Sequence, residues 1–186
     1  NNVLSFIQKA ALATNVALTS TKAKTNVPVR ITAASFLQQG DTASFIGNVM
    51  VQDGDDTLRC KRLNIHFAKP DGVQVIEAID DFELRQGLNI VRSGRASYNL
   101  KEGIIRITEK PQWESEGRSG VADMFVFKRA EGTGFAEGNV FMKLPLTNIT
   151  DAAAVTNSVP STNLLQIYSD KFRFYEAQSN RLASAF

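Results

Sequence analysis

The sequence predicts an all-β fold: an antiparallel β-jellyroll or two-sheet sandwich, open at its ends and built from degenerate hairpin repeats of about 30 residues. Three observations support this. Apolar and polar residues alternate after residue 28, turns rich in Gly and Asp recur at short intervals, and Gly-Asn-Val occurs twice, in FIGNVMV at 45–51 and in FAEGNVFMKL at 135–144. Period-two alternation between closely spaced turn signals is typical of short antiparallel strands.

Residues 1–28 lack this alternation and form a separate N-terminal segment in our interpretation. The stretch LSFIQKAALA at 4–13 has the Ala and Leu content of a short amphipathic helix, and a strand is the alternative. The start of the chain has no basic-then-apolar signal pattern, and no apolar run approaches the roughly 18 residues that a membrane helix needs. We therefore expect this sequence to be a mature region or a piece of a longer protein.

Residues 29–144 carry the strand pattern of one domain. Leu63, Ile65 and Phe67 alternate with polar residues, and Phe125 and Phe127 do so later in the chain. Three stretches each read as strand, polar turn, strand: LNIHFAKPDGVQVIEA at 63–78, ASYNLKEGIIRIT at 96–108 and MFVFKRAEGTGFAEG at 124–138. A recurring hairpin of this kind indicates stacked units that bury their apolar faces against one another.

The two Gly-Asn-Val stretches fit this repeat. Gly47 and Gly138 are three steps of roughly thirty residues apart. Gly accepts backbone angles that other residues resist, and Asn is the next most tolerant residue. We predict that Gly-Asn-Val marks the point where the chain turns into the next layer, and that Lys61-Arg62 is a candidate β-bulge.

The end of the chain is interpreted as two segments. Residues 145–163, PLTNITDAAAVTNSVPSTN, are rich in Thr, Asn, Ala and Ser with little charge, which predicts a linker or long loop. Residues 164–186 resume the hairpin pattern in KFRFYEAQSNRLASAF at 171–186. We expect 164–186 to be the start of a further β-repeat that is cut short.

Composition excludes several functional classes. The 21 basic and 19 acidic residues leave a formal charge of only +2, and the basic residues form short groups such as Lys128 and Arg129. Nucleic-acid binding needs a broader basic stripe. The single Cys60 and single His66 supply neither an internal disulfide nor a zinc site. We expect no nucleic-acid partner, no metal and no cofactor.

The order and spacing of these stretches resemble the OstA-like family of lipopolysaccharide transport, which includes LptA, LptC and the N-terminal domain of LptD. The resemblance begins with VRITAASFLQQGDTASFIGNVMVQDGDDTLRCKRLNIHF at 29–67. It continues through VIEAIDDFELRQG, ASYNLKEGIIRITEKPQW and FVFKRAEGTGFAEGNVFMKL, and restarts at 166–186. It therefore covers about residues 29–144, the proposed domain.

The resemblance implies a non-enzymatic periplasmic carrier or bridge, for which attachment of the full-length parent protein to the inner or outer membrane is one option. It implies that lipid A acyl chains of lipopolysaccharide, or a related amphiphile, bind between two apolar sheet faces. It also implies edge-strand pairing with other β-jellyroll transport proteins, or head-to-tail self-association, through edges at 29–37 and at 139–144 or 166–175. The residues expected to line the interior are Phe67, Phe82, Trp113, Phe125, Phe127, Phe135 and Val140.

Two alternatives remain at this stage. A structural β-repeat scaffold without a ligand would share the strand pattern but fill its interior completely. A polysaccharide-active enzyme would use paired carboxylates, for which the clusters at 53–56 and at 80–81 are the candidates. A gap between the sheets favours the carrier, whereas a carboxylate pair in a surface cleft favours the enzyme.

Overall fold

The computed structural model describes residues 29–69, 72–145 and 164–175, so the predictions for 1–28 and 146–163 lie outside the described residues. The described chain consists of twelve strands and one 3-10 turn, η1 (Arg129–Glu131). The strands are β1 (Arg30–Thr32), β2 (Ser35–Gln39), β3 (Thr42–Asp53), β4 (Asp56–Ala68), β5 (Gly72–Gln86), β6 (Asn89–Asn99), β7 (Ile104–Thr108), β8 (Gln112–Ser115), β9 (Arg118–Val121), β10 (Met124–Lys128), β11 (Thr133–Pro145) and β12 (Leu164–Tyr175). The predicted all-β class is confirmed.

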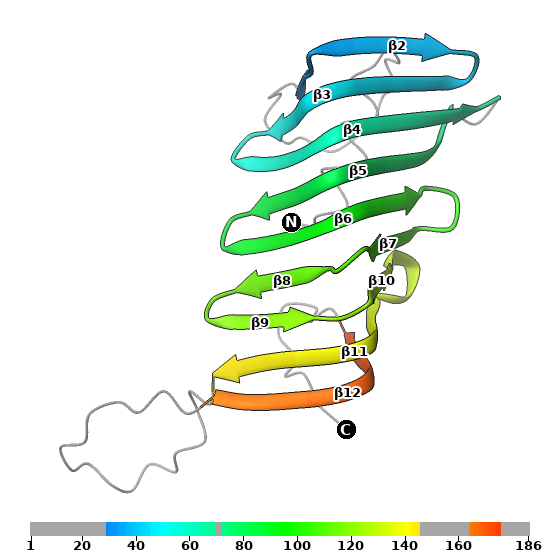
Figure 1. Ribbon diagram of the computed structural model, residues 1–186. Coiled ribbons are helices and arrows are strands. Elements are labelled where there is room, and N and C mark those ends of the chain that lie inside the picture. Colours follow the sequence, from blue (N-terminus) through cyan, green and yellow to red (C-terminus); the bar gives the residue numbers. More distant parts are fainter. Residues whose placement is uncertain (1–28, 70–71, 146–163, 176–186) are drawn as a thin grey trace, which may run out of the picture.

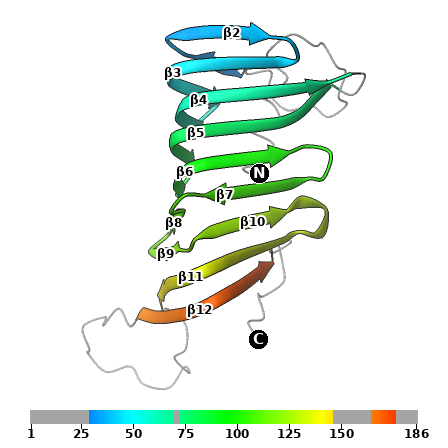
Figure 2. The same cartoon turned by 45° about the vertical axis from the view of Figure 1, so that its right-hand side comes forward.

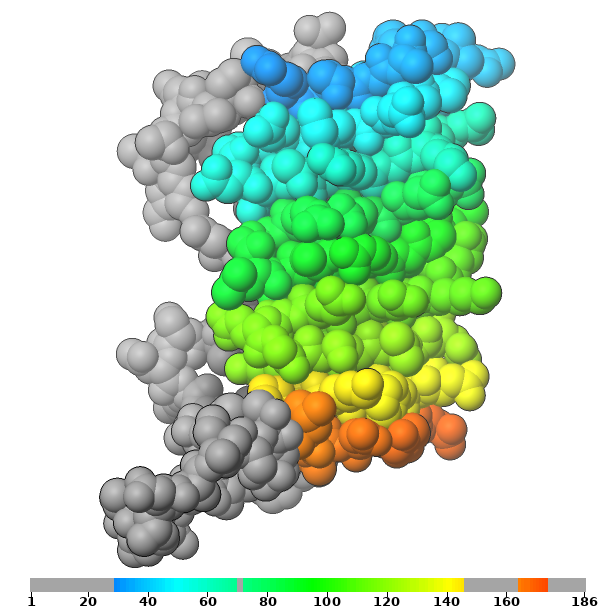
Figure 3. All heavy atoms as spheres, turned by 60° about the vertical axis from the view of Figure 1, so that its left-hand side comes forward, coloured from blue at the N-terminus to red at the C-terminus, as the bar shows by residue number. Residues whose placement is uncertain are grey.

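The strands form one antiparallel sheet that stacks in chain order (Figure 1). Its long strands are β3, β4, β5, β6, β11 and β12. The short strands come in pairs that each act as one long strand broken in the middle: β1 and β2 both pair with β3, β8 and β7 both pair with β6, and β9 and β10 both pair with β11. The same succession is visible as colour bands from the N-terminal to the C-terminal end in the space-filling view (Figure 3).

A column of two-residue corners folds this sheet in two. The corners are Gly47-Asn48 in β3, Asp80-Asp81 in β5, Glu109-Lys110 between β7 and β8, and Gly138-Asn139 in β11. All eight residues have positive φ, between 47° and 81°. The corners begin at residues 47, 80, 109 and 138, so they are 33, 29 and 29 residues apart. The predicted period, the three steps and the role of Gly-Asn-Val are therefore confirmed.

The candidate bulge at Lys61-Arg62 needs correction. Arg62 pairs with Ile46 in β3, and Cys60 pairs with Val49, so only Lys61 lies opposite the two-residue corner of β3. The extra residue belongs to the neighbouring strand, because a bulge places two residues against one.

The neighbouring broken strand explains glycine at the outer corners. Where β1 gives way to β2, the backbone N–H of Ala34 donates to the carbonyl of Gly47 at 2.9 Å, and a Cβ atom at Gly47 would lie 2.9 Å from the Cβ of Ala34. Between β9 and β10, the N–H of Asp123 donates to the carbonyl of Gly138 at 2.8 Å. Positive φ and this crowding both favour a residue without a side chain.

The corners place two inner faces against each other, as the turned view shows (Figure 2). One half carries β1, β8 and β9, and the other carries β2, β7 and β10. A single core cluster takes residues from both halves, for example Leu58 and Leu84 from the first and Ile76 and Ile105 from the second. This is a two-layer arrangement made from one sheet, as the jellyroll prediction requires.

β12 belongs to this same sheet. It pairs with β11 over Thr133↔Tyr175 to Pro145↔Leu164, with a register shift at the Gly138-Asn139 corner. Residues 164–175, predicted to open a further repeat, thus form the last described strand of this domain, and 176–186 lie outside the described residues.

Candidate functional site

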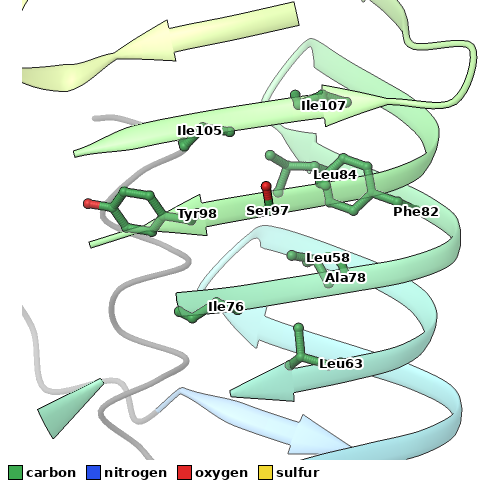
Figure 4. Close-up of a pocket in the computed structure, with 11 residues that line it drawn as sticks. Leu58, Leu63, Ile76, Ala78, Phe82, Leu84, Ser97, Tyr98, Ile105 and Ile107 are labelled. Atoms are coloured by element: carbon green, nitrogen blue, oxygen red, sulfur yellow. The ribbon is translucent and has the colours of Figure 1, made fainter. Parts of the chain in front are cut away.

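The centre of the interior is filled. The space between the halves there amounts to about 20 Å³, room for one water molecule at most. Figure 4 shows side chains of β4 to β7 pointing into it, with Phe82 and Leu84 from one half and Ile105 and Ile107 from the other. Phe82 is only 2% exposed. The middle of the molecule is therefore an ordinary packed core.

The interior opens towards the C-terminal end. A cavity of about 340 Å³ lies between strands β8 to β12, within the range of small-molecule sites, which is about 300–1,000 Å³. Its lining residues are Trp113, Arg118, Phe125, Phe127, Ala136, Met142, Leu144 and Phe172. All but Arg118 are apolar, so the cavity suits a hydrocarbon chain.

Strand register places small residues beside the aromatic ones that line this cavity. Phe125 pairs with Ala136, and Phe127 pairs with Gly134. On the other half, Trp113 pairs with Gly120. Small neighbours beside the rings occupy less of the interior than large ones would, which leaves room for the cavity.

The second strand neighbour of Gly120 leaves little room for a side chain at this position. It also pairs with Met142 of β11, and a Cβ atom at this position would lie 3.2 Å from Cε of Met142. A side chain at Gly120 would therefore push Met142 or occupy the cavity itself.

The structure separates six of the seven predicted lining residues into three groups. Trp113, Phe125 and Phe127 line the open cavity together. Phe82 and Val140 are buried in the packed core. Phe67 is half-buried near the end of β4, away from both cavities, whose linings lie elsewhere in the described residues.

Phe135 is a correction, because it lies on the outer face. Its neighbour Ala136 is fully buried and points inward, so the strand alternation turns Phe135 outward. Three cations cover its ring, at 5.6 Å for Lys128 Nζ, 5.3 Å for Lys171 Nζ and 4.8 Å for Arg173 Cζ from the ring centre. Cation–π contacts of this kind stabilise an aromatic ring at the surface.

Sequence reasoning missed five lining residues. Four of them follow the same period-two alternation as the predicted residues and could have been found from it: Ala136, Met142, Leu144 and Phe172. Arg118 carried no such signal, because a charged residue on an inner face contradicts the apolar pattern.

The acidic clusters of the sequence lie on turns and at the corner. Asp53, Asp55 and Asp56 belong to the tight turn between β3 and β4. Asp81 forms an ion pair with Lys61 at 3.0 Å. Within residues 29–69, 72–145 and 164–175, no group of three His, Cys, Asp or Glu side chains is arranged to hold a metal ion. Burial raises the pKa of the Cys60 thiol to about 12, so this thiol stays protonated at neutral pH.

Charged residues of the central strands pair on the outer face. Glu83 accepts hydrogen bonds from Arg85 at 2.7 Å and from Arg92 at 2.9 Å, and these hold its pKa below the usual value. Desolvation raises the pKa of Glu77, but the hydrogen bonds from Arg95 and His66 outweigh this effect, so the pKa of Glu77 lies below its usual value. The central strands thus keep these paired charges on the face opposite the packed core.

No helix in the part of the chain that the structure describes is long and apolar enough to cross a membrane.

Comparison with known proteins gives one family match and a group of structural matches. Residues 30–142, more than half of the chain, match the family described as LptA/(LptD N-terminal domain) LPS transport protein. Among solved structures, the chain is similar to LptH, the LptA-homologous periplasmic component of the conserved lipopolysaccharide transport device from Pseudomonas aeruginosa. The identity is 14%, the match covers 75% of this chain and 94% of that one, and the TM-score is 0.48. Among curated proteins, none matches this chain.

Proposed function

The chain belongs to the LptA and LptD N-terminal domain family of lipopolysaccharide transport proteins, and we propose that it is a non-enzymatic periplasmic carrier that shelters acyl chains in its interior. The cargo in this proposal is lipopolysaccharide, through its lipid A acyl chains, or a related amphiphile. Release from water supplies the binding energy, at about 0.8 kcal/mol for each CH₂ group buried.

The open C-terminal cavity is the observation that supports this proposal. Trp113, Phe125, Phe127 and Phe172 give it an aromatic and apolar wall, whereas the central core leaves no room for a chain. We therefore place the acyl chains between β8 and β12 rather than along the whole molecule.

The two ends of the sheet fit partners that pair by edge strands. β2 is exposed along its whole length, with Phe36 at 56% and Leu37 at 54% exposure. At the other end, β12 exposes Leu164, Leu165 and Tyr168. Among the described residues, β2 pairs only with β3 and β12 only with β11, and apolar edge strands of this kind favour pairing with a further β-jellyroll protein or with a second copy, head to tail.

One predicted edge is wrong. Residues 139–144 of β11 pair with β12 on one side and with β9 on the other, so they are interior to the sheet. Edge pairing in this proposal uses β1 and β2 at one end and β12 at the other.

Photo-crosslinking to purified lipopolysaccharide tests the carrier function. A photoreactive residue at Phe127 faces the cavity, and the same residue at Val126 serves as a matched control on the opposite face of β10. We expect adducts at 127 and none at 126. Equal labelling at both positions, or none at 127 in a folded protein, would contradict an interior binding site.

The filled centre favours one second candidate, a structural β-repeat scaffold without a ligand. In that case the C-terminal cavity is only a packing defect. The same crosslinking experiment distinguishes the two functions, because a scaffold yields no adduct at 127.

A further inference from the structure

We propose that the C-terminal cavity selects amphiphiles with an anionic head group, and that Arg118 binds that group at the cavity mouth. This inference rests on the proposed carrier function and adds the chemical class of its ligand. The hydrocarbon chain lies against Trp113, Phe125 and Phe127, and a phosphate or carboxylate pairs with the guanidinium.

Strand register directs Arg118 inward. Gly120, two residues later in β9, is buried and pairs with Trp113 and with Met142, both of which line the cavity. Residues two apart in a strand share a face, so Arg118 lies on the same inner face. It lines the cavity together with these apolar side chains, and it is the charged member of that lining.

Protection of a sheet edge does not explain this inward charge. Inward-pointing charged residues occur on exposed edge strands, where they discourage aggregation. β9, however, is not an edge strand: Arg118 pairs with Ser115 of β8, and from Ser119 onward β9 also pairs with β11. A cation on the inner face of an interior strand requires another explanation.

Arg118 is also an uncommitted cation within the described chain. Arg85, Arg92 and Arg95 each form an ion pair with a glutamate. Arg118 has no carboxylate within 4.0 Å among residues 29–69, 72–145 and 164–175. Its guanidinium is therefore available to an anion from outside the described chain.

The position of Arg118 matches the shape of an amphiphile. It is the first residue of β9, next to the turn that joins β8 and β9, and its side chain is exposed to water. Phe125 is deeply buried, at 4% exposure. A bound molecule would keep its head in water at the mouth and its chain inside. Arginine suits this role because its planar fork holds phosphate or carboxylate with two parallel hydrogen bonds.

Calorimetric titration with three probes of equal chain length tests the inference: dodecyl phosphate, dodecanoate and the neutral dodecyl maltoside, all below their micelle concentrations. We expect the wild-type protein to bind at least one anionic probe about tenfold more tightly than the neutral one, because a charge-assisted hydrogen bond at an exposed site is of that order. Comparison of the phosphate with the carboxylate identifies which head group is preferred.

Arg118→Gln should remove the anionic preference and leave the affinity for dodecyl maltoside unchanged. Arg106→Gln is the matched control, because Arg106 is an exposed arginine on β7, outside the cavity lining. An anionic preference that survives in Arg118→Gln overturns the inference, as does a wild-type protein that binds all three probes equally. Equal binding leaves the carrier function standing, whereas a wild-type protein that binds none of the probes overturns both.

Discussion

Replacement of Gly138 by alanine tests whether corner crowding shapes this fold. Gly138 has a φ of +71°, and a Cβ atom there would overlap the Asp123 side chain, whose own Cβ would be 3.0 Å away. The left-handed conformation costs an L-residue about 1–2 kcal/mol, of which the reduced entropy of the unfolded chain returns about 0.4–1 kcal/mol.

Crowding adds to this conformational cost at Gly138. Overpacking costs about 1–3 kcal/mol. Displacement of Asp123 also weakens its hydrogen bond from Asn139, which measures 2.8 Å and contributes about 0.5–1.5 kcal/mol. We therefore expect Gly138→Ala to lower the free energy of unfolding by about 2–5 kcal/mol, measured by urea denaturation.

Gly54→Ala is the matched control. Gly54 has a φ of +63°, and a Cβ atom there would meet no other atom within 4 Å. This variant isolates the conformational cost, so its loss should be about 1 kcal/mol or less. In an Asp123→Gly background, the extra loss at Gly138 should disappear. If Gly138→Ala and Gly54→Ala lose the same stability, crowding by the broken neighbouring strand is refuted as the reason for glycine at this corner.

Three further predictions follow from the same structure. Asp80→Gly should raise the free energy of unfolding by about 0.5–1 kcal/mol, because Asp80 holds a φ of +60° at an exposed corner, and a decrease in urea denaturation would contradict this. Phe82→Ala in the packed centre should lower the free energy of unfolding by about 3–5 kcal/mol, and Phe127→Ala at the open cavity should lower it clearly less. Equal losses would contradict a packed centre beside an open C-terminal cavity. Arg85 and Arg92 lower the pKa of Glu83, so its stabilisation is complete above the unfolded-state pKa of about 4.3 and is lost as pH falls through the lower folded-state value. Glu83→Gln should therefore be less stable than wild type at pH 7 and should lose less stability on acidification to about pH 3, and an unchanged pH dependence would contradict this.

The strand pattern and the repeat could be predicted because both rest on local chemistry. The dipeptide Gly-Asn predicts positive φ at the corners that begin at residues 47 and 138, because Gly and Asn adopt positive φ at the lowest cost. The central corners at 80–81 and 109–110 adopt the same conformation with Asp-Asp and Glu-Lys, which carry no comparable signal. Their position depends on the neighbouring strands rather than on their own preference.

The shape of the interior could not be predicted, because it depends on which residues meet across the fold. Phe82 fills the centre, whereas Phe125 lines the open cavity together with its small neighbour Ala136. The bulk of its aromatic ring predicts an inner position for Phe135, although the small residues beside it are the buried ones and three cations contact its ring at the surface. Arg118 shows the opposite case: its charge predicts an outer position, whereas it lines the cavity.

Quenching of Trp113 fluorescence is the most direct test of the central claim, that the C-terminal cavity binds the acyl chain of an amphiphile. Trp113 is the only tryptophan of the chain and lines the cavity, so it reports on this site alone. Titration with lipopolysaccharide and with an amphiphile brominated along its chain, below its micelle concentration, should give saturable quenching by the brominated probe that lipopolysaccharide reverses by competition. A Trp113→Phe variant with the tryptophan moved to Val126, on the outer face, should show no saturable quenching. Absence of saturable quenching at Trp113, or equal quenching at both positions, would contradict the account.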